Sequence, residues 1–287
     1  MTDQRSTDHH SRTTSTGDDL SESSYLDIHF DAMRSEYEAM IRSVGIKPGW
    51  HVLDAGCGGG SFLTLLAELV GSSGHISALD QAPEHIEEVE TLVDSGRFVC
   101  PVAAKLGKIT SLPYEDNSFD AVWCAAVTQY LTDEELQKML VEFRRIVRPH
   151  GIVAVKDFDL TLHQLIPGDP IATWILFEAL QAVNRQIQGT LRVLHLPIWL
   201  KKAGLIDVRY KTTICERQAP LRPAEQEFIG GVYRFYASKA ENIGLPEPVL
   251  MTWRKLGNTD SPDHIMKQPD FYYREGHIIT VAKVPNG

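Results

Sequence analysis

Residues 52–61 combine an acid with a cluster of glycines, a pattern suited to holding a small charged ligand. A short apolar run ends at Asp54, a glycine-rich turn begins at Gly56, and an apolar segment follows at 62–70. Glycine permits a tight turn and a close approach of the backbone, which leaves the first N–H groups of the following helix pointing at the ligand. The stretch therefore predicts a strand, a binding loop and a helix.

Asp54 separates two classes of cofactor that such a loop could hold. Gly56 and Gly58 begin the G-x-G-x-x-G pattern of nicotinamide enzymes, but Ser61 stands where the third glycine belongs. The carboxylate of Asp54 would also lie beside the phosphates of a dinucleotide and repel them. A ligand with a cationic amino group suits the loop better, and a nicotinamide oxidoreductase is the weakest alternative.

Three further stretches follow the order of motifs in one enzyme family. Asp80 ends a second apolar run, residues 112–123 read L-P-Y-E-D-N-S-F-D-A-V-W, and residues 144–151 read R-R-I-V-R-P-H-G. With the D-x-G-x-G-x-G loop that starts at Asp54, they resemble class I S-adenosylmethionine-dependent methyltransferases from about Ile46 onward. The resemblance is greatest to the small-molecule branch, which includes ubiquinone/menaquinone-biosynthesis-like and natural-product enzymes.

The resemblance implies a site for S-adenosylmethionine at this loop. The implied cofactor-binding residues are Asp54, Gly56, Gly58, Asp80, Gln81, Lys108, Ile109 and Ala125. Asp54 and the loop would hold the methionine part, and Asp80 would hold the ribose hydroxyls. The family usually has an aspartate where Lys108 stands, and an ammonium group cannot accept a hydrogen bond from the adenine amino group. Adenine must then be held by the backbone, by Ile109 or by another side chain.

Three residues are candidates for catalysis. Methyl transfer is an in-line displacement that depends mainly on alignment and on the exclusion of water, and a base helps when the acceptor is a hydroxyl or a protonated nitrogen. Asp157 follows the expected fifth strand, Tyr130 follows the fourth, and His29 lies on helices that can fold over the cofactor in relatives. The structural alternatives are a helix cap or solvated acid for Asp157 and core packing for Tyr130 and His29.

The strands alternate with helices, which predicts an α/β fold. We expect a Rossmann-like, doubly wound and mostly parallel seven-stranded sheet. Its strands are expected at 51–55, 75–79, within 97–109, and at 119–125, 152–158, 207–214 and 277–284. The tail 1–24 is expected to be disordered, 25–45 to form an N-terminal helical cap, and 46–287 to form the methyltransferase domain. A helical lid insertion at about 217–275 is expected before the last strand.

The composition restricts the partners of the chain. A formal net charge of -10 in 287 residues repels a phosphate backbone, so no nucleic-acid partner is expected. No apolar run approaches the roughly 20 residues that span a bilayer, and no membrane partner is expected. The four cysteines have no C-x-x-C pair or metal-ligand spacing, so we expect reduced thiols, no metal and a cytoplasmic location. The oligomeric state stays open, with a homodimer among the options.

The predicted function is methyl transfer from S-adenosylmethionine to O, N or C of a hydrophobic or aromatic small molecule, in secondary metabolism. The aromatic-rich segment 228–236 of the lid insertion would suit such a substrate. The alternative is an S-adenosylmethionine-binding enzyme that catalyses a cyclisation or rearrangement without net methyl transfer. A nucleic-acid or protein methyltransferase is disfavoured, because C-A-A-V stands at 124–127 in place of an Asn/Asp-Pro-Pro-Tyr motif.

Overall fold

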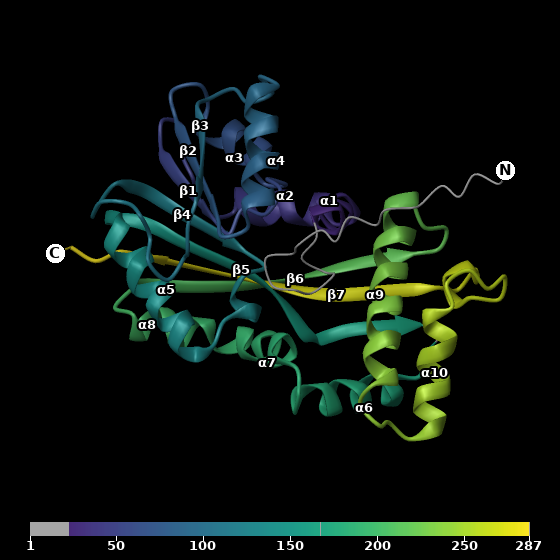
Figure 1. The fold of residues 1–287 in the computed structure, drawn as a ribbon. Coiled ribbons are helices and arrows are strands. Elements are labelled where there is room, and N and C mark those ends of the chain that lie inside the picture. The colour runs from purple at the N-terminus through teal and green to yellow at the C-terminus, as the bar shows by residue number, and fades with distance from the viewer. Residues whose placement is uncertain (1–22, 167, 287) are drawn as a thin grey trace, which may run out of the picture.

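The computed structural model of the chain describes residues 23–166 and 168–286. A seven-stranded sheet runs through the molecule in the order β3-β2-β1-β4-β5-β7-β6 (Figure 1). The strands are β1 His51–Ala55, β2 His75–Asp80, β3 Val102–Leu106, β4 Phe119–Ala125, β5 Val147–Ile166, β6 Ile206–Gln218 and β7 Tyr272–Lys283. Only β7 runs antiparallel to its neighbours in the sheet, which confirms the predicted mostly parallel, Rossmann-like fold.

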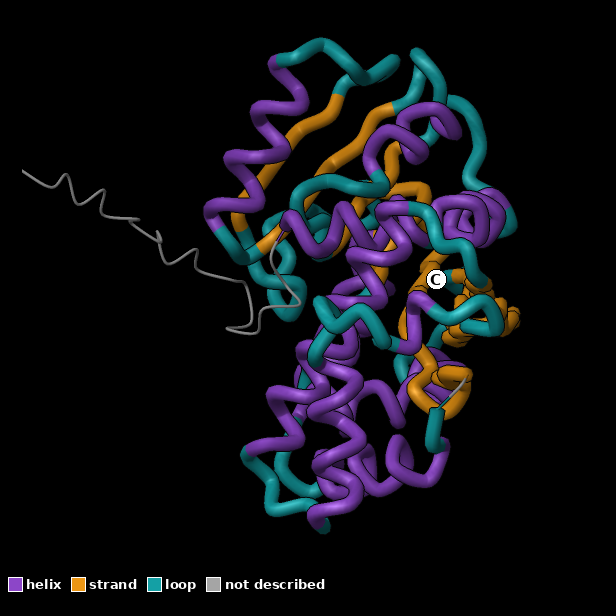
Figure 2. The backbone as a smooth tube through the Cα atoms, turned by 90° about the vertical axis from the view of Figure 1, so that its right-hand side faces the viewer, coloured by secondary structure: helices purple, strands orange, loops and turns teal. Residues whose placement is uncertain are grey.

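Helices cover both faces of the sheet because each face is apolar. The helices of one face are α2 Arg34–Arg42, α3 Leu63–Val70 and α4 Pro83–Asp94. The helices of the other face are α5 Asp133–Ile146 and α8 Leu196–Lys202. Strand β4 contributes Trp123 to the first core and Cys124 to the second, as alternating side chains of a strand must. Figure 2 shows from the side that the upper strands lie between helices, whereas the lower part is mainly helical.

The strands β5, β6 and β7 extend beyond the rest of the sheet and carry a second group of helices (Figure 1). The helices of this group are α6 Pro170–Gln181, α7 Arg185–Arg192, α9 Pro223–Glu241 and α10 Glu247–Gly257. The last two form the helical insertion predicted before the final strand. Helix α1, Ser23–Ala32, packs against α9, so the N-terminal helices and the insertion meet over the same part of the molecule.

Two predicted elements differ from the structure. Strand β5 has 20 residues and continues far beyond Phe158, because β7 resumes pairing with it at Gln164 after a register break. The sequence also predicts one helix over 171–186, but two helices form there. Helix α6 ends at Gln181, and Asn184 caps α7 by accepting a hydrogen bond from Ile187 N. Polar residues after Phe158 and the apolar run through 183 concealed both features.

The predicted tail 1–24 lies outside the described residues except for Ser23 and Ser24, where α1 begins. Among the described residues, no helix is both long and apolar enough to cross a bilayer. The four cysteines are buried and form no disulfide in this part of the chain.

Candidate active site

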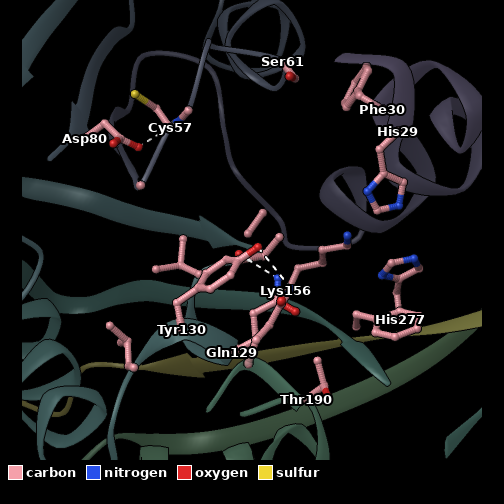
Figure 3. Close-up of a pocket in the computed structure, with 18 of the residues that line it drawn as sticks. His29, Phe30, Cys57, Ser61, Asp80, Gln129, Tyr130, Lys156, Thr190 and His277 are labelled. Carbon is pink, nitrogen blue, oxygen red and sulfur yellow. Dashed lines mark hydrogen bonds between the residues drawn. The ribbon is translucent and has the colours of Figure 1, made fainter. Parts of the chain in front are cut away.

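A cavity of about 610 Å³ lies at the carboxyl ends of the parallel strands. The chain reaches the edge of the sheet at β3 and then returns to β4 beside β1, and ligands of open α/β sheets bind at such a reversal. The cavity has two ends, seen at the upper left and the right of Figure 3. The glycine-loop end is lined by Asp54, Gly56, Gly58, Asp80, Gln81, Lys108 and Ile109. The histidine end is lined by His29, Tyr37, Lys156, His163, Glu275 and His277.

The loop after β1 needs glycine for two physical reasons. Gly56 has a φ of +77°, which L side chains rarely adopt, and a Cβ there would lie 2.5 Å from Val127 Cγ2. The N–H groups of Gly56 and Cys57 both donate to Leu79 O, at 2.7 and 3.0 Å, so the loop is fixed against the end of β2. The cradle therefore depends on backbone geometry more than on side chains.

Asp80, at the end of β2, holds this loop in place through hydrogen bonds. Its Oδ2 accepts a hydrogen bond from Gly58 N at 3.0 Å, and its Oδ1 accepts one from Ala82 N at 3.0 Å. Burial would raise the pKa of Asp80, but the neighbouring His85 and the backbone N–H groups outweigh burial and lower that pKa. Asp80 is therefore ionised and keeps lone pairs for a ligand hydroxyl.

Asp54 has an unsatisfied oxygen. The side chain is 2% exposed, and Oδ2 has no hydrogen-bond partner among the described residues. Burial, with a smaller contribution from the Asp80 charge, raises the pKa of Asp54 to about 8. Because buried polar atoms are almost always paired, a ligand with a cationic donor fits this position.

Residues 108–110 form the remaining wall of the glycine-loop end. Lys108 and Ile109 line the cavity as the sequence suggested, and Thr110 lines it beside them. Thr110 carries a hydroxyl that can accept a hydrogen bond, which the ammonium group of Lys108 cannot do. All eight predicted cofactor residues, including Gln81 and Ala125, line this one cavity.

Five side chains from two distant parts of the chain meet at the histidine end. Glu275 Oε1 lies 2.8 Å from His277 Nε2 and 3.2 Å from His29 Nε2. Tyr37 Oη lies 2.7 Å from His29 Nε2 and 3.2 Å from His277 Nε2. Tyr273 Oη donates to the other carboxylate oxygen of Glu275 at 2.5 Å. Burial would raise the pKa of Glu275, but the two histidines hold it well below its usual range.

Lys156 lies between the two ends of the cavity (Figure 3). It pairs with Ala125 in the β4–β5 register, and its Nζ lies 3.7 Å from the centroid of the Tyr37 ring. The side chain is 2% exposed, and burial lowers the pKa of Lys156 to about 8. A large fraction of this amine is therefore neutral in mildly alkaline solution, and a neutral amine can accept a proton.

The outer wall of the histidine end is aromatic. Phe228, Phe235 and Tyr236 of α9 line it, together with Phe158 of β5. His163 lies among these rings, and neither of its ring nitrogens has a hydrogen-bond partner in the described residues. Burial lowers the pKa of His163 to about 4, so the ring is neutral and offers one donor and one acceptor to a ligand.

Asp157 lies apart from the other two predicted catalytic residues. His29 and Tyr130 line the cavity, but Asp157 is absent from its described lining. Asp157 Oδ2 accepts hydrogen bonds from Thr128 N, at 3.0 Å, and from Thr128 Oγ1. Burial raises the pKa of Asp157 to about 6, although these bonds oppose it. Asp157 therefore fixes the short helix η2, Thr128–Tyr130, which presents Tyr130 to the cavity.

Sequence reasoning missed Tyr37, Lys156, Glu275 and His277. A signal existed for three of them, because Lys156 interrupts an apolar strand and Glu275 and His277 interrupt the start of another. A charged or polar residue inside a buried strand is uncommon unless it is paired or functional. Tyr37 gave no such signal, since an aromatic residue on an amphipathic helix is typical of core packing.

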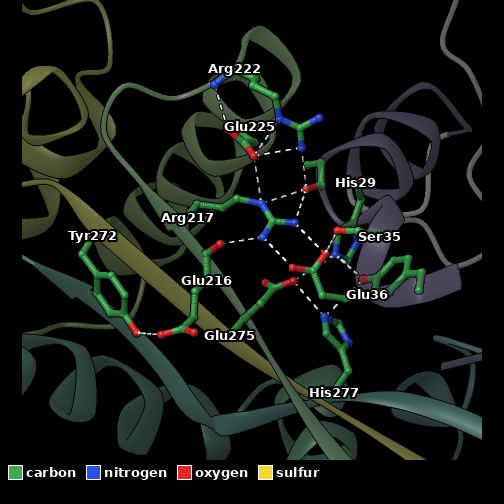
Figure 4. A network of polar contacts seen from close by, with 12 residues as sticks. His29, Ser35, Glu36, Glu216, Arg217, Arg222, Glu225, Tyr272, Glu275 and His277 are labelled. Carbon is green, nitrogen blue, oxygen red and sulfur yellow. Dashed lines mark hydrogen bonds and ion pairs between the residues drawn. The ribbon is translucent and has the colours of Figure 1, made fainter. Parts of the chain in front are cut away.

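A buried arginine ties together the elements that enclose the histidine end (Figure 4). Arg217 of β6 lies 2.8 Å from Glu36 of α2 and 3.0 Å from Glu225 of α9, and it donates to Ala32 O at the end of α1. Burial would raise the pKa of Glu36, but hydrogen bonds from Arg217 lower it below its usual range. We call Arg217, Glu36 and Glu225 the arginine latch.

Comparisons with known proteins agree on the type of domain. Residues 52–151 match the family model of a methyltransferase domain. The chain is 31% identical over 121 residues to the 2-phytyl-1,4-naphtoquinone methyltransferase of Trichormus variabilis, which covers 42% of this chain and 52% of that protein. It is 27% identical over 191 residues to methyltransferase GfsG of Streptomyces halstedii, which covers 65% of this chain and 63% of that protein. The chain thus spans about half to two thirds of these relatives.

Solved structures share the fold. The phosphoethanolamine N-methyltransferase 2 of Haemonchus contortus, in complex with S-adenosyl-L-methionine, superposes with a TM-score of 0.55 at 15% identity. The match covers 96% of this chain and 59% of that one. At this identity the likeness concerns the fold alone.

Proposed function

We propose that this chain, which carries a class I S-adenosylmethionine-dependent methyltransferase domain, transfers a methyl group to a largely apolar small molecule. This acceptor binds at the histidine end of the cavity. The observation that carries the proposal is the unpartnered, buried carboxyl oxygen of Asp54 inside a glycine cradle. A carboxyl group in that position suits the ammonium group of the methionine part of the cofactor.

S-adenosylmethionine is the cofactor of this domain, and when bound it supplies a methyl group on a positively charged sulfur. In our proposal Asp54 pairs with the cofactor's ammonium group, and Asp80 accepts hydrogen bonds from the ribose hydroxyls. Ile109 packs on the adenine, while Thr110 accepts a hydrogen bond from its amino group. Thr110 thereby takes the place of the acid that Lys108 replaces.

The acceptor class follows from the lining of the other end. Phe158, Phe228 and Tyr236 offer apolar rings to the cavity, and His163 offers a neutral hydrogen-bonding group among them. These side chains suit an aromatic or otherwise flat molecule with a hydroxyl or carbonyl group at His163. We place the reaction in biosynthesis, because the named relatives include a naphthoquinone methyltransferase.

Lys156 is our candidate for the proton acceptor. The acceptor's oxygen or nitrogen forms the bond to the methyl carbon as the carbon–sulfur bond breaks, and neutral Lys156 takes the proton. Since the pKa of Lys156 is lowered to about 8, kcat should rise with pH and level off near that value. A Lys156→Arg variant keeps the charge but stays protonated, and it should retain cofactor binding with kcat lowered roughly 100-fold.

Calorimetric titration of the purified chain with S-adenosylmethionine and S-adenosylhomocysteine tests the proposal. We expect one molecule bound per chain and affinity at least about tenfold lower in Asp54→Asn, because the ion pair is lost. The matched control is Asp94→Asn, an exposed acid at the end of α4 that should leave the affinity unchanged. A wild-type chain that binds neither compound contradicts the proposal.

Product analysis separates methyl transfer from the alternative chemistry. Incubation with a panel of hydroxylated aromatic compounds should yield S-adenosylhomocysteine and a methylated product in equal amounts. Conversion of an acceptor with no S-adenosylhomocysteine formed would favour the cyclisation or rearrangement hypothesis.

A further inference from the structure

The four polar atoms at the histidine end form a closed ring of short contacts. His29 Nε2 lies 2.7 Å from Tyr37 Oη, which lies 3.2 Å from His277 Nε2. Glu275 Oε1 closes the ring, at 2.8 Å from His277 Nε2 and 3.2 Å from His29 Nε2. His277 and Glu275 are almost completely buried, and all four side chains line the cavity. We call these atoms the four-atom ring.

Hydrogen bonding cannot explain all four contacts at once. Every contact in the ring includes the Nε2 atom of His29 or of His277. An imidazole Nε2 has a single position in the ring plane, which holds either one proton or one lone pair. Each of the two nitrogens therefore makes one good hydrogen bond, and at most two of the four contacts are hydrogen bonds in any protonation state. The other two contacts bring atoms together without a proton between them.

A cation resolves this conflict, since all four atoms can direct a lone pair at a common centre. The ligand atoms of His29, Glu275 and His277 lie within 4.8 Å of one another. Bonds of about 2.1 Å place neighbouring ligands about 3.0 Å apart at right angles and about 3.4 Å apart at the tetrahedral angle, so small movements of these side chains suffice to bind an ion. We propose that His29, Tyr37, Glu275 and His277 bind a divalent transition-metal ion such as Zn²⁺, Co²⁺, Mn²⁺ or Fe²⁺.

The ligand set favours these ions over Mg²⁺ and Ca²⁺. Two imidazoles with one carboxylate suit Zn²⁺ and the neighbouring transition metals, whereas Mg²⁺ and Ca²⁺ prefer oxygen ligands alone. The carboxylate of Glu275 supplies one negative charge, and Tyr273 Oη holds its second oxygen in place. The Nζ atom of Lys156 lies 3.7 Å from the centroid of the Tyr37 ring, so the protonated form of Lys156 opposes the ion.

A metal ion at this position would restrict which molecules can serve as the methyl acceptor. The ring borders the cavity, so the ion keeps positions open to a bound molecule. An acceptor oxygen bound to the ion loses its proton more readily. This step rests on the proposed methyl transfer, and it selects acceptors with metal-binding oxygens, such as a catechol or a β-hydroxy ketone. Metal binding itself is independent of that reaction.

Titration of the full chain with Co²⁺ and Zn²⁺ tests the site, with calorimetry and the visible absorption of Co²⁺ as readouts. The background carries His9→Ala and His10→Ala, so that this histidine pair cannot bind the metals. We expect one ion per chain, with affinity at least about tenfold lower in Glu275→Gln and in His277→Gln. Glu216→Gln, a matched change at an exposed residue of the neighbouring strand, should bind as the parent does.

The proposal is overturned if the parent binds no ion, or if Glu275→Gln and His277→Gln both bind as the parent does. Titration of each variant with S-adenosylhomocysteine shows that it is folded and tests the proposed function separately.

Discussion

The two ends of the cavity are built in different ways. At the glycine-loop end, the loop is set by backbone N–H groups and by Asp80, within a segment of fewer than thirty residues. At the histidine end, His29 and Glu275 meet although they are 246 positions apart, and both are held by helices and strands that must pack first. The first end therefore depends on local dihedral angles, while the second depends on tertiary structure.

Because of this difference, substitutions at the two ends should impair different properties of the protein, cofactor binding at one end and stability at the other. A change in the loop should reduce cofactor binding and leave the remainder of the fold intact. A change in the arginine latch should loosen α1, α2 and α9 and reduce stability, with a smaller effect on the loop. Five predictions follow this division, in order of expected effect.

Arg217→Met should produce the largest effect, on stability. The change removes the cation that Glu36 and Glu225 share. Glu225 keeps its pair with Arg222, but Glu36 is left without a cation in a partly buried place, and breaking such a pair costs about 3–5 kcal/mol. Urea unfolding followed by circular dichroism measures the loss. Arg254→Met is the control, since its pairs with Glu241 and Glu247 are exposed and should add nothing measurable. Equal stability of the two variants would show that the latch is not needed.

Asp80→Ala should raise the Kd for S-adenosylhomocysteine at least about 100-fold. The change removes the proposed acceptor for the ribose hydroxyls. It also releases the loop, because Gly58 N and Ala82 N lose their acceptor, and each buried polar group left unsatisfied costs about 1–3 kcal/mol. Calorimetry measures the affinity, and Asp80→Asn, which keeps one acceptor oxygen, should lose less. If the Arg217→Met variant lost more affinity than Asp80→Ala, the cofactor end would depend on the latch and the division would fail.

Gly56→Ala should weaken cofactor binding roughly 10- to 100-fold, because two separate strains arise. The methyl group meets Val127 Cγ2 at 2.5 Å, and a residue with a side chain at φ +77° adds about 1–3 kcal/mol. The double variant with Val127→Ala removes the collision but keeps the backbone strain, so it should recover part of the affinity. Full recovery would mean that the backbone angle is unimportant.

The fold and the glycine-loop end could be predicted because their signals are local. Asp54, Gly56 and Asp80 stand at fixed spacings around strand ends, and the alternation of strands and helices along the sequence predicted the parallel sheet. The histidine end could not be predicted, since nothing local relates His29 to Glu275 or His277. Asp157 illustrates the same limit: its place after an apolar run was correct, but only the structure shows that Thr128 lies beneath it.

The smallest effect concerns the pH dependence of cofactor binding through Asp54. The pKa of Asp54 is raised to about 8 in the ligand-free protein, so its carboxyl group is mostly protonated at pH 6. Binding of a cationic amino group requires the ionised form, and affinity should therefore rise about tenfold from pH 6 to pH 7. Calorimetry in two buffers of different ionisation enthalpy should also detect a released proton. Asp54→Asn should bind more weakly at every pH and with no such slope.

The stability of the ligand-free protein should change in the opposite direction. An unfolded chain gives up the Asp54 proton near pH 4, whereas the folded protein keeps it to about pH 8, so the contribution of this group falls as the pH rises between those values. If Asp54 pairs with the cofactor's amino group as proposed, the bound cofactor supplies the missing counter-charge, and the rise in Tm on adding S-adenosylhomocysteine should increase from pH 6 to pH 7. A rise in Tm that is independent of pH would mean that another group holds the cofactor's amino group. The glycine-loop end would then depend on a contact as distant in sequence as those of the histidine end.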